Sequence, residues 1–361
     1  MFRRPRERAA PRATNSDMNA DASAQILTLT EAGLYCPAGG FHIDPLRPVD
    51  RAVVTHGHAD HARPGHRAVL ATGETLDIMV ARYGETCFGT GQALAYGAPL
   101  KVGDTTVTLH PAGHILGSAQ VAIAYRGARA VVSGDYKTRP DPTCAAYEPV
   151  ACDVFVSEAT FGLPVFRHPP PQQEIGKLLR SLAQFPERTH LVGAYPLGKA
   201  QRVIRLLRDA GYDAPIFLHG AMGTLTQLYE RHGVALGDLR PLEAADKSVA
   251  ARGGVVVCPP SATTDRWSRR FVDPVVAFAS GWMRVRARAR QRGVELPLVI
   301  SDHVDWTELT AAVEATGCRQ LWVTHGQEDA LVHWAQQARG LAARPLRLLG
   351  YAEDGEPEGA A

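Results

Sequence analysis

One stretch of the sequence decides the expected fold: Ala52-Val53-Val54-Thr55-His56-Gly57-His58-Ala59-Asp60-His61. A short apolar, β-branched run, typical of a buried strand, leads here into an H-x-H-x-D-H string. Imidazole nitrogen and carboxylate oxygen are ligands that zinc binds readily. A single histidine usually has a surface or capping role, but four ligand-type side chains within six residues argue against that explanation. The stretch therefore predicts a strand whose exit loop binds a metal ion.

Three later segments repeat this order of an apolar run followed by a ligand-type side chain. They end at His114 after Pro111-Ala112-Gly113, at Asp135 after Val131-Val132-Ser133-Gly134, and at His325 after Leu321-Trp322-Val323-Thr324. Apolar, β-rich runs recur up to about residue 160, with few helical patterns between them. Loops that leave one edge of a β-sandwich can converge on one cleft, so we expect these side chains to join the first group.

The motifs HGHADH, AGHILGSA, SGDYK and VTHG occur in this order and resemble the metal-binding motifs of the metallo-β-lactamase superfamily. The resemblance implies an α/β fold, an αββα sandwich with two divalent metal ions, zinc or alternatively manganese. Carried over position by position, it implies His56, His58 and His114 for the first metal, Asp60, His61 and His325 for the second, and Asp135 as the bridge. An aspartate behind the ligands would orient them, and Asp44 matches it, with Asp50 as a competing assignment.

A long segment separates the last two ligands. His325 lies 190 residues after Asp135, far more chain than a small-molecule hydrolase of this superfamily needs. Strands alternate there with helices expected at 198–210, 224–232 and 306–316, which predicts a separate parallel sheet. The block resembles the β-CASP branch, whose members are nucleases acting on RNA or DNA. The domains implied are a disordered tail (1–25), a metallo-β-lactamase domain in two parts (26–170 and 298–350), a β-CASP insertion (171–297) and an acidic tail (351–361).

Two additional motifs of that branch have counterparts in this sequence. The segment 152–161 resembles the first, with Glu158 as its acid, and 299–305 resembles the second, with His303 as its histidine. A third position is histidine in the RNA-processing members and valine in the DNA-repair Artemis group, and here it is His325. The catalytic residues implied are His303, Glu158 and Asp60. An imidazolium at His303 could protonate the departing oxygen of a phosphodiester, an effect worth roughly 10² to 10⁴ in rate.

Three residues are expected to contact substrate: Lys199, Ser280 and Arg284. Lys199 follows a glycine at an expected helix N-terminus, where backbone N–H groups favour phosphate, although the segment is not a Walker A loop. Ser280 and Arg284 lie in a segment that resembles the part of the β-CASP domain facing the cleft. Arginines alternate from 284 to 292, which suits either a solvated helix face or a groove along a strand. Trp267 and Trp282 could stack on bases or pack in the core.

The resemblance is closest to bacterial proteins described as ligase-associated DNA exonucleases, which also carry an older label as mRNA 3′-end processing factors. The segments 33–45 and HADHARPGH are further shared features. The resemblance implies a DNA exonuclease of DNA repair, with a metal-bridged hydroxide attacking phosphorus. DNA, rather than RNA, is the expected nucleic-acid partner, and a DNA ligase or helicase is an implied protein partner. An RNA nuclease, a small-molecule hydrolase and an inactive scaffold remain as alternatives.

Composition sets the outer limits of these expectations. A chain of 361 residues exceeds the roughly 250 to 300 at which a single core stops growing. The formal charge of +2 is weak support for nucleic-acid binding, although 34 of the 39 basic residues are arginine. Six scattered cysteines indicate neither a disulfide framework nor a cysteine zinc site. Since no apolar run approaches the length of a membrane span and no secretory signal is evident, we expect a cytoplasmic protein.

Overall fold

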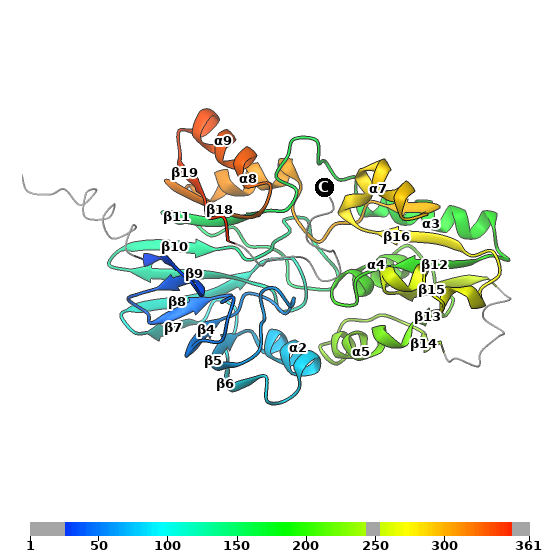
Figure 1. The fold of residues 1–361 in the computed structure, drawn as a ribbon, viewed down its shortest axis with the longest axis horizontal. Coiled ribbons are helices and arrows are strands. Elements are labelled where there is room, and N and C mark those ends of the chain that lie inside the picture. Colours follow the sequence, from blue (N-terminus) through cyan, green and yellow to red (C-terminus); the bar gives the residue numbers. More distant parts are fainter. Residues whose placement is uncertain (1–25, 243–252, 349–361) are drawn as a thin grey trace, which may run out of the picture.

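The computed structural model describes residues 26–242 and 253–348. The tails expected at 1–25 and 351–361 lie outside the described residues. Helices and strands alternate along the described chain, so the prediction of an α/β protein is confirmed. Figure 1 shows two sheets in one half of the molecule and a third sheet in the other half.

The first sheet is built from the N-terminal strands. Its order follows the chain: β1 (Thr28–Thr30), β2 (Gly33–Cys36), β3 (Phe41–Ile43), β4 (Arg51–Val53), β5 (His66–Ala71) and β6 (Phe88–Ala93). The pairs from β3 to β6 are parallel, so β4 and β5 end on the same side. β4 is the strand predicted before the histidines, and Val53 at its end is buried.

The second sheet faces the first. Its order is β19 (Ala342–Pro345), β18 (Gln320–Gly326), β11 (Val154–Ala159), β10 (Ala128–Val132), β9 (Ala119–Tyr125), β8 (Thr105–Pro111) and β7 (Pro99–Val102). Ile43 and Val53 of the first sheet share one buried apolar cluster with Val107, Val121 and Val132 of the second. The two sheets therefore bury their apolar faces against each other, which is the main stabilising contribution in this half of the molecule.

Helices cover the outer faces of this pair of sheets. α2 (Gly73–Tyr83) places Met79 against the first sheet. α8 (Trp306–Thr316) and α9 (Glu328–Arg339) pack against the second sheet through an apolar cluster that includes Leu309 and Leu331. These layers hold the ends of the central strands in fixed positions.

The third sheet is formed by the chain between β11 and β18. Its order is β14 (Leu239–Pro241), β13 (Ile216–Leu218), β15 (Gly254–Cys258), β12 (Thr189–Gly193), β16 (Val275–Ala279) and β17 (Leu296–Leu298). Every strand pairing given for this sheet is parallel, as predicted. α3 (Pro171–Gln184), α4 (Lys199–Asp209) and α5 (Gly223–Arg231) bury their apolar sides against one face of this sheet. Trp267 packs on the opposite face, beside Leu191 and Val256.

The helices expected at 198–210, 224–232 and 306–316 are confirmed as α4, α5 and α8. α2, α3 and α9 were not predicted. The signal for α2 is present in the sequence, since the Thr72 hydroxyl accepts a hydrogen bond from the backbone N–H of Thr75 at 3.2 Å, a typical N-cap. In the part of the chain that the structure describes, no helix combines the length and the apolar character needed to cross a bilayer.

Candidate metal centre

The ligand-type residues predicted from the sequence lie at the ends of strands of both facing sheets. His56 to His61 follow β4, His114 lies between β8 and β9, Asp135 follows β10, and His325 is the residue before the last of β18. Gly134 makes the exit from β10 possible, because its φ is +56° and a Cβ there would lie 2.6 Å from the Thr55 hydroxyl. His325 itself has a φ of 60°, a left-handed conformation that is uncommon for residues other than glycine.

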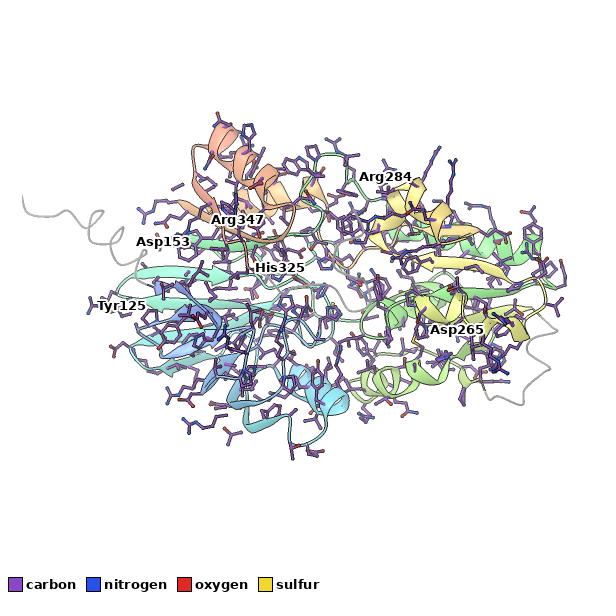
Figure 2. All side chains as sticks on the ribbon, in the orientation of Figure 1. Tyr125, Asp153, Asp265, Arg284, His325 and Arg347 are labelled. Atoms are coloured by element: carbon purple, nitrogen blue, oxygen red, sulfur yellow. The ribbon has the colours of Figure 1, made fainter. Side chains whose placement is uncertain are left out.

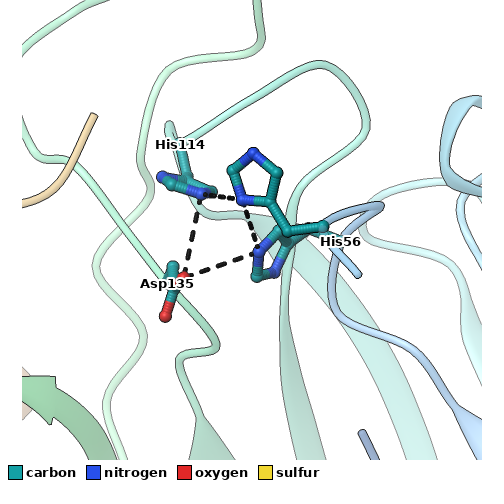
Figure 3. Close-up of side chains that lie close together, drawn as sticks. His56, His114 and Asp135 are labelled. Carbon is teal, nitrogen blue, oxygen red and sulfur yellow. Dashed lines mark hydrogen bonds and ion pairs between the residues drawn. The ribbon is translucent and has the colours of Figure 1, made fainter. Parts of the chain in front are cut away.

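Three imidazoles and one carboxylate make up the first group of side chains, whose ligand atoms all lie within 4.8 Å of one another: His56, His58, His114 and Asp135. The Nδ1 atom of His58 lies 3.2 Å from His56 Nε2 and 3.0 Å from His114 Nε2. Figure 3 shows His56, His114 and Asp135 pointing toward one another. All four residues are buried.

Asp60, His61 and His325 form the second group, with the rings of His61 and His325 stacked at 4.9 Å. Asp135 lies between the two groups. Its Oδ2 atom is 3.4 Å from His61 Nε2, 3.5 Å from His56 Nε2 and 3.9 Å from His114 Nε2. This is the position that a carboxylate shared by two metal ions would need.

In four of the ligand-type histidines, the ring nitrogen that faces away from the centre has an oxygen partner. His61 Nδ1 donates to Asp44 at 2.8 Å, and His114 Nδ1 donates to the carbonyl of Asp302 at 2.9 Å. His58 Nε2 faces the Leu197 carbonyl at 3.3 Å, and His56 Nδ1 faces the Thr55 hydroxyl at 3.0 Å. These contacts fix the tautomers, so the lone pairs of the other nitrogens point into the centre.

The charge state of the centre follows from its burial. Burial holds the pKa of His56 and His114 well below the ordinary value, and burial together with nearby His61 lowers the pKa of His325 to about 3. Burial alone would also lower the pKa of His61, but Asp135 and the neighbouring carboxylates outweigh it and raise that pKa. Neutral imidazoles with converging lone pairs repel one another unless a cation lies between them. The donor set therefore fits divalent metal ions of the kind that bind nitrogen and oxygen.

A second buried pair lies beside the metal-ligand groups. His303 Nδ1 lies 2.9 Å and 3.0 Å from the two carboxylate oxygens of Glu158. Those oxygens also accept from the backbone N–H of Tyr136 at 2.8 Å and from the Thr160 hydroxyl at 2.6 Å. The ring of His303 lies 4.7 Å from that of His114. Glu158 is thus immobilised and holds His303 at the edge of the centre.

The competing assignments of the orienting aspartate are separated by the structure. Asp44 is buried, and it accepts from Thr55 as well as from His61. Asp50 pairs with Arg67 at the surface, where its side chain is 85% exposed.

We expect Asp44→Ala to weaken metal binding by about 10- to 100-fold, because the imidazole of His61 loses its orienting partner. Asp50→Ala serves as the matched control, and metal titrations of both variants test the assignment. Equal losses in the two variants would contradict it.

Two of the three expected substrate contacts are placed where substrate has no access. Lys199 is 3% exposed, and its ammonium donates to Asp302 at 2.7 Å and to the Ile300 carbonyl at 2.9 Å. Ser280 is 2% exposed and caps the following turn by accepting from the backbone N–H of Trp282. The expectation of phosphate binding at Lys199 is therefore corrected: the Gly198 N–H is already bonded to Gln201, and the lysine neutralises a buried carboxylate. Arg284, in contrast, is exposed and projects outward in Figure 2.

A buried ionic network beneath the centre was not anticipated from the sequence. Arg202 of α4 is 1% exposed and pairs with both Asp141 and Asp302. It also donates to the carbonyls of Ser301 at 2.6 Å and His114 at 2.9 Å. The arginine therefore connects the third sheet to the His114 loop and to the segment that carries His303. In the sequence, the only signal near Arg202 is the Gly198-Lys199 step before it. That step predicted a phosphate-binding helix start and not a buried ion pair.

Comparison with known proteins agrees with this geometry. No family model matches the chain. The chain is 29% identical over 334 residues to the "Probable DNA ligase" of Opitutus terrae, a match that covers 90% of this chain and 31% of that protein. It is 28% identical over 240 residues to "Ribonuclease TTHA0252" of Thermus thermophilus, covering 56% of this chain and 52% of that protein. The chain thus spans about a third of the first relative's length and about half of the second's.

A solved structure, of a protein of unknown function from Enterococcus faecalis V583, has a TM-score of 0.54 at 14% identity and covers 77% of this chain and 76% of that one. This likeness concerns the fold alone. Further relatives are named as an RNase, a transcription termination factor and an endoribonuclease. These relatives and the two ligand groups that meet at Asp135 agree with the resemblance of the chain to the β-CASP branch of the metallo-β-lactamase superfamily.

Proposed function

We propose that this protein is a metal-dependent DNA exonuclease that serves DNA repair. The observation that carries the proposal is the position of Asp135 Oδ2 between two groups of ligand-type side chains, with the Glu158–His303 pair beside them. Support for DNA comes from the relative named as a probable DNA ligase, whose match extends over 90% of this chain. The proposal also takes the two facing sheets with their helices as an αββα sandwich, and residues 171–297 as an inserted domain.

The roles proposed for the residues follow from their contacts. His56, His58 and His114 would hold one metal ion, and Asp60, His61 and His325 a second, with Asp135 shared between them. Two such ions supply an activated water molecule and neutralise the charge of a phosphodiester. Zinc suits the nitrogen-rich donor set, and manganese is the alternative.

His303 is proposed as the proton donor to the departing oxygen. Its Nδ1 faces Glu158, which leaves Nε2 to carry the proton that is transferred. Glu158 acts on the reaction only through His303, by keeping the ring in one orientation. Since Glu158 is itself bonded to Tyr136 and Thr160, its orientation is set before substrate binds.

RNA is the second candidate substrate, and two observations favour it. One is the set of relatives named as ribonuclease and endoribonuclease. The other is the histidine at position 325, the residue type implied for RNA-processing members. Digestion of end-labelled DNA and RNA strands of identical sequence by the metal-loaded protein separates the two, because only the 2′-OH differs. Shortening of DNA from one end is the expected result. Preferential RNA cleavage would overturn the choice of substrate, and cleavage of neither would overturn the nuclease proposal.

Replacement of His303 by alanine is expected to slow cleavage by about 10² to 10⁴ while the metal content stays at the wild-type level, because only the proton donor is removed. His333→Ala, on the exposed side of α9, is the control and should cleave at the wild-type rate. Single-turnover rates and metal analysis of the purified variants provide the measurement. Loss of metal from His303→Ala would instead identify His303 as a ligand, a role that its position within 4.8 Å of Asp135 also allows.

A further inference from the structure

The most strongly charged segment in the described part of the chain lies between Pro274 and Val294. It contains five arginines and no acidic residue: Arg284, Arg286, Arg288, Arg290 and Arg292. The segment includes a 3₁₀ turn at Gly281–Arg284 and α7 (Arg286–Gln291). Of the two arrangements expected for these arginines, the structure has the helix: Arg286, Arg288 and Arg290 lie on α7, and none of the five lies on a strand.

The five arginines divide into two sets by their surroundings. Arg288 lies 4.1 Å from the ring centre of Trp282, and Arg292 lies 5.2 Å from that of Phe278, so both are half-buried against aromatic rings. Arg284, Arg286 and Arg290 are exposed, and none of them has an ion-pair partner among the described residues. Ala289 points inward to Met283 and Val299. One side of α7 is therefore anchored, and the other presents guanidinium groups to solvent.

This arrangement has an electrostatic cost that only an anion would relieve. Arg286 and Arg290 are four residues apart on one helix, where like charges destabilise the helix. The neighbouring acid Glu295 is already occupied by Arg188 at 2.8 Å. A partner that brings several negative charges in a row would remove this repulsion.

The exposed arginines and the segment that carries His303 both follow strands of the third sheet, and both leave it at the carboxyl ends of those strands. β16 and β17 are parallel neighbours, with Ala279 paired to Leu298, so both chains leave the sheet on one side. After β16 the chain continues into the turn that carries Trp282 and Arg284, and after β17 into Ser301 and His303. Ligands of open parallel sheets bind at the carboxyl ends of the strands.

A chain of ring contacts connects the two segments directly. The ring of Trp282 lies 4.8 Å from that of Phe161, and Phe161 lies 6.2 Å from the ring of His303. Gly281 allows this contact, since a Cβ there would lie 2.4 Å from the Phe161 ring. The rings of Trp282 and Phe161 thus connect the start of the arginine segment to His303, the proposed proton donor.

We propose that Arg284, Arg286 and Arg290 form a binding surface for the phosphate backbone of a single nucleic-acid strand as it extends away from the metal centre. The proposal rests on the proposed nuclease function and adds the direction in which the strand runs. Guanidinium groups bind phosphate oxygens without reading bases, so the surface holds strands of any sequence. Binding should therefore depend on strand length and on salt rather than on sequence.

The test uses the metal-loaded full chain and a single-stranded phosphorothioate DNA of about 30 nucleotides, which keeps the backbone charge and resists hydrolysis. Each phosphate contact on a single strand contributes about −0.7 to the slope of log K against log salt. The variant R284A/R286A/R290A should therefore have a slope shallower by about 2 and an affinity about 100-fold lower at about 0.1 M salt. Alanine is the best helix former, so α7 should persist.

Two matched variants complete the design. R284K/R286K/R290K keeps the charges and should keep the wild-type slope. R51A/R67A/R126N removes three exposed arginines from the opposite end of the first two sheets, and it should keep both the slope and the affinity. An unchanged slope in the alanine variant, or an equal loss in the lysine variant, would overturn the proposal. Cleavage of ordinary DNA by the wild type is measured in parallel. If the wild type does not cleave DNA, the nuclease function is contradicted, whereas the salt slopes alone decide whether the three arginines bind the strand.

Discussion

Replacing Asp135 with alanine is expected to abolish phosphodiester cleavage and to release bound metal. The Oδ2 atom of this residue lies within 3.9 Å of ligand nitrogens in both groups of side chains. Its loss therefore removes a negative ligand from each proposed metal position at once. Removal of one group that stabilises charge in an active site commonly costs about 10² to 10³ in rate, and Asp135 would serve two metal ions, so we expect a loss of about 10³-fold or more here.

Asp135→Asn tests the contribution of the charge alone, because asparagine has nearly the same shape as aspartate. It keeps the size and one oxygen atom, so it should retain the fold while losing most of the metal affinity. Asp104→Ala, in the exposed turn between β7 and β8, removes a carboxylate without touching the centre and should behave as the wild type. Elemental analysis and cleavage of an end-labelled strand are the two measurements. Full activity and full metal content in Asp135→Ala would show that the two ligand groups do not act as one centre.

Arg202→Met is expected to have the largest effect on stability. The arginine is buried with Asp141 and Asp302, and removal of one partner from a buried ion pair typically costs about 3 to 5 kcal/mol. Burial would raise the pKa of both aspartates, but Arg202 and the adjacent lysines hold each pKa below its ordinary value. Without the guanidinium, two carboxylates would remain buried with less compensation. The midpoint of denaturant unfolding should fall accordingly.

Arg205→Met is the matched control, on the same helix one turn along. Arg205 pairs with Asp209 at 2.8 Å, but both side chains are partly exposed, and such a pair on a helix contributes only about 0.3 to 0.5 kcal/mol. Parallel unfolding curves measure the difference between the two arginines. Similar midpoints for both variants would mean that the network around Arg202 does not stabilise the fold.

Local sequence patterns predicted the strands and several helices because their causes are local. α4 follows from an apolar stripe through Val203, Ile204 and Leu207, and all three are buried. α2 was missed although Thr72 is a regular N-cap, because glycines flank the helix and the surrounding segment is rich in strands. Here the apolar side of the helix is specified by packing on the first sheet, and packing is a tertiary effect.

Phosphate binding at Lys199 was predicted wrongly for a related reason. A lysine at a helix start after glycine has the same local pattern whether its ammonium faces solvent or a buried carboxylate. Asp302, its partner, lies 103 residues further along the chain. No local pattern reports such a pairing, because the distance between the two side chains is set only when α4 and the chain after β17 pack together at the third sheet.

The sequence by itself determined the set of ligand-type residues, since His56 to His61 lie in one strand exit and the other members follow their strands in the same way. The tertiary structure decided how those residues are held. His114 donates to the carbonyl of Asp302 across 188 positions, and His58 faces the carbonyl of Leu197 across 139. Backbone carbonyls are identical in every residue, so no side-chain pattern can mark the ones that orient an imidazole. Only the packing of the third sheet against the strand ends brings them within hydrogen-bond distance.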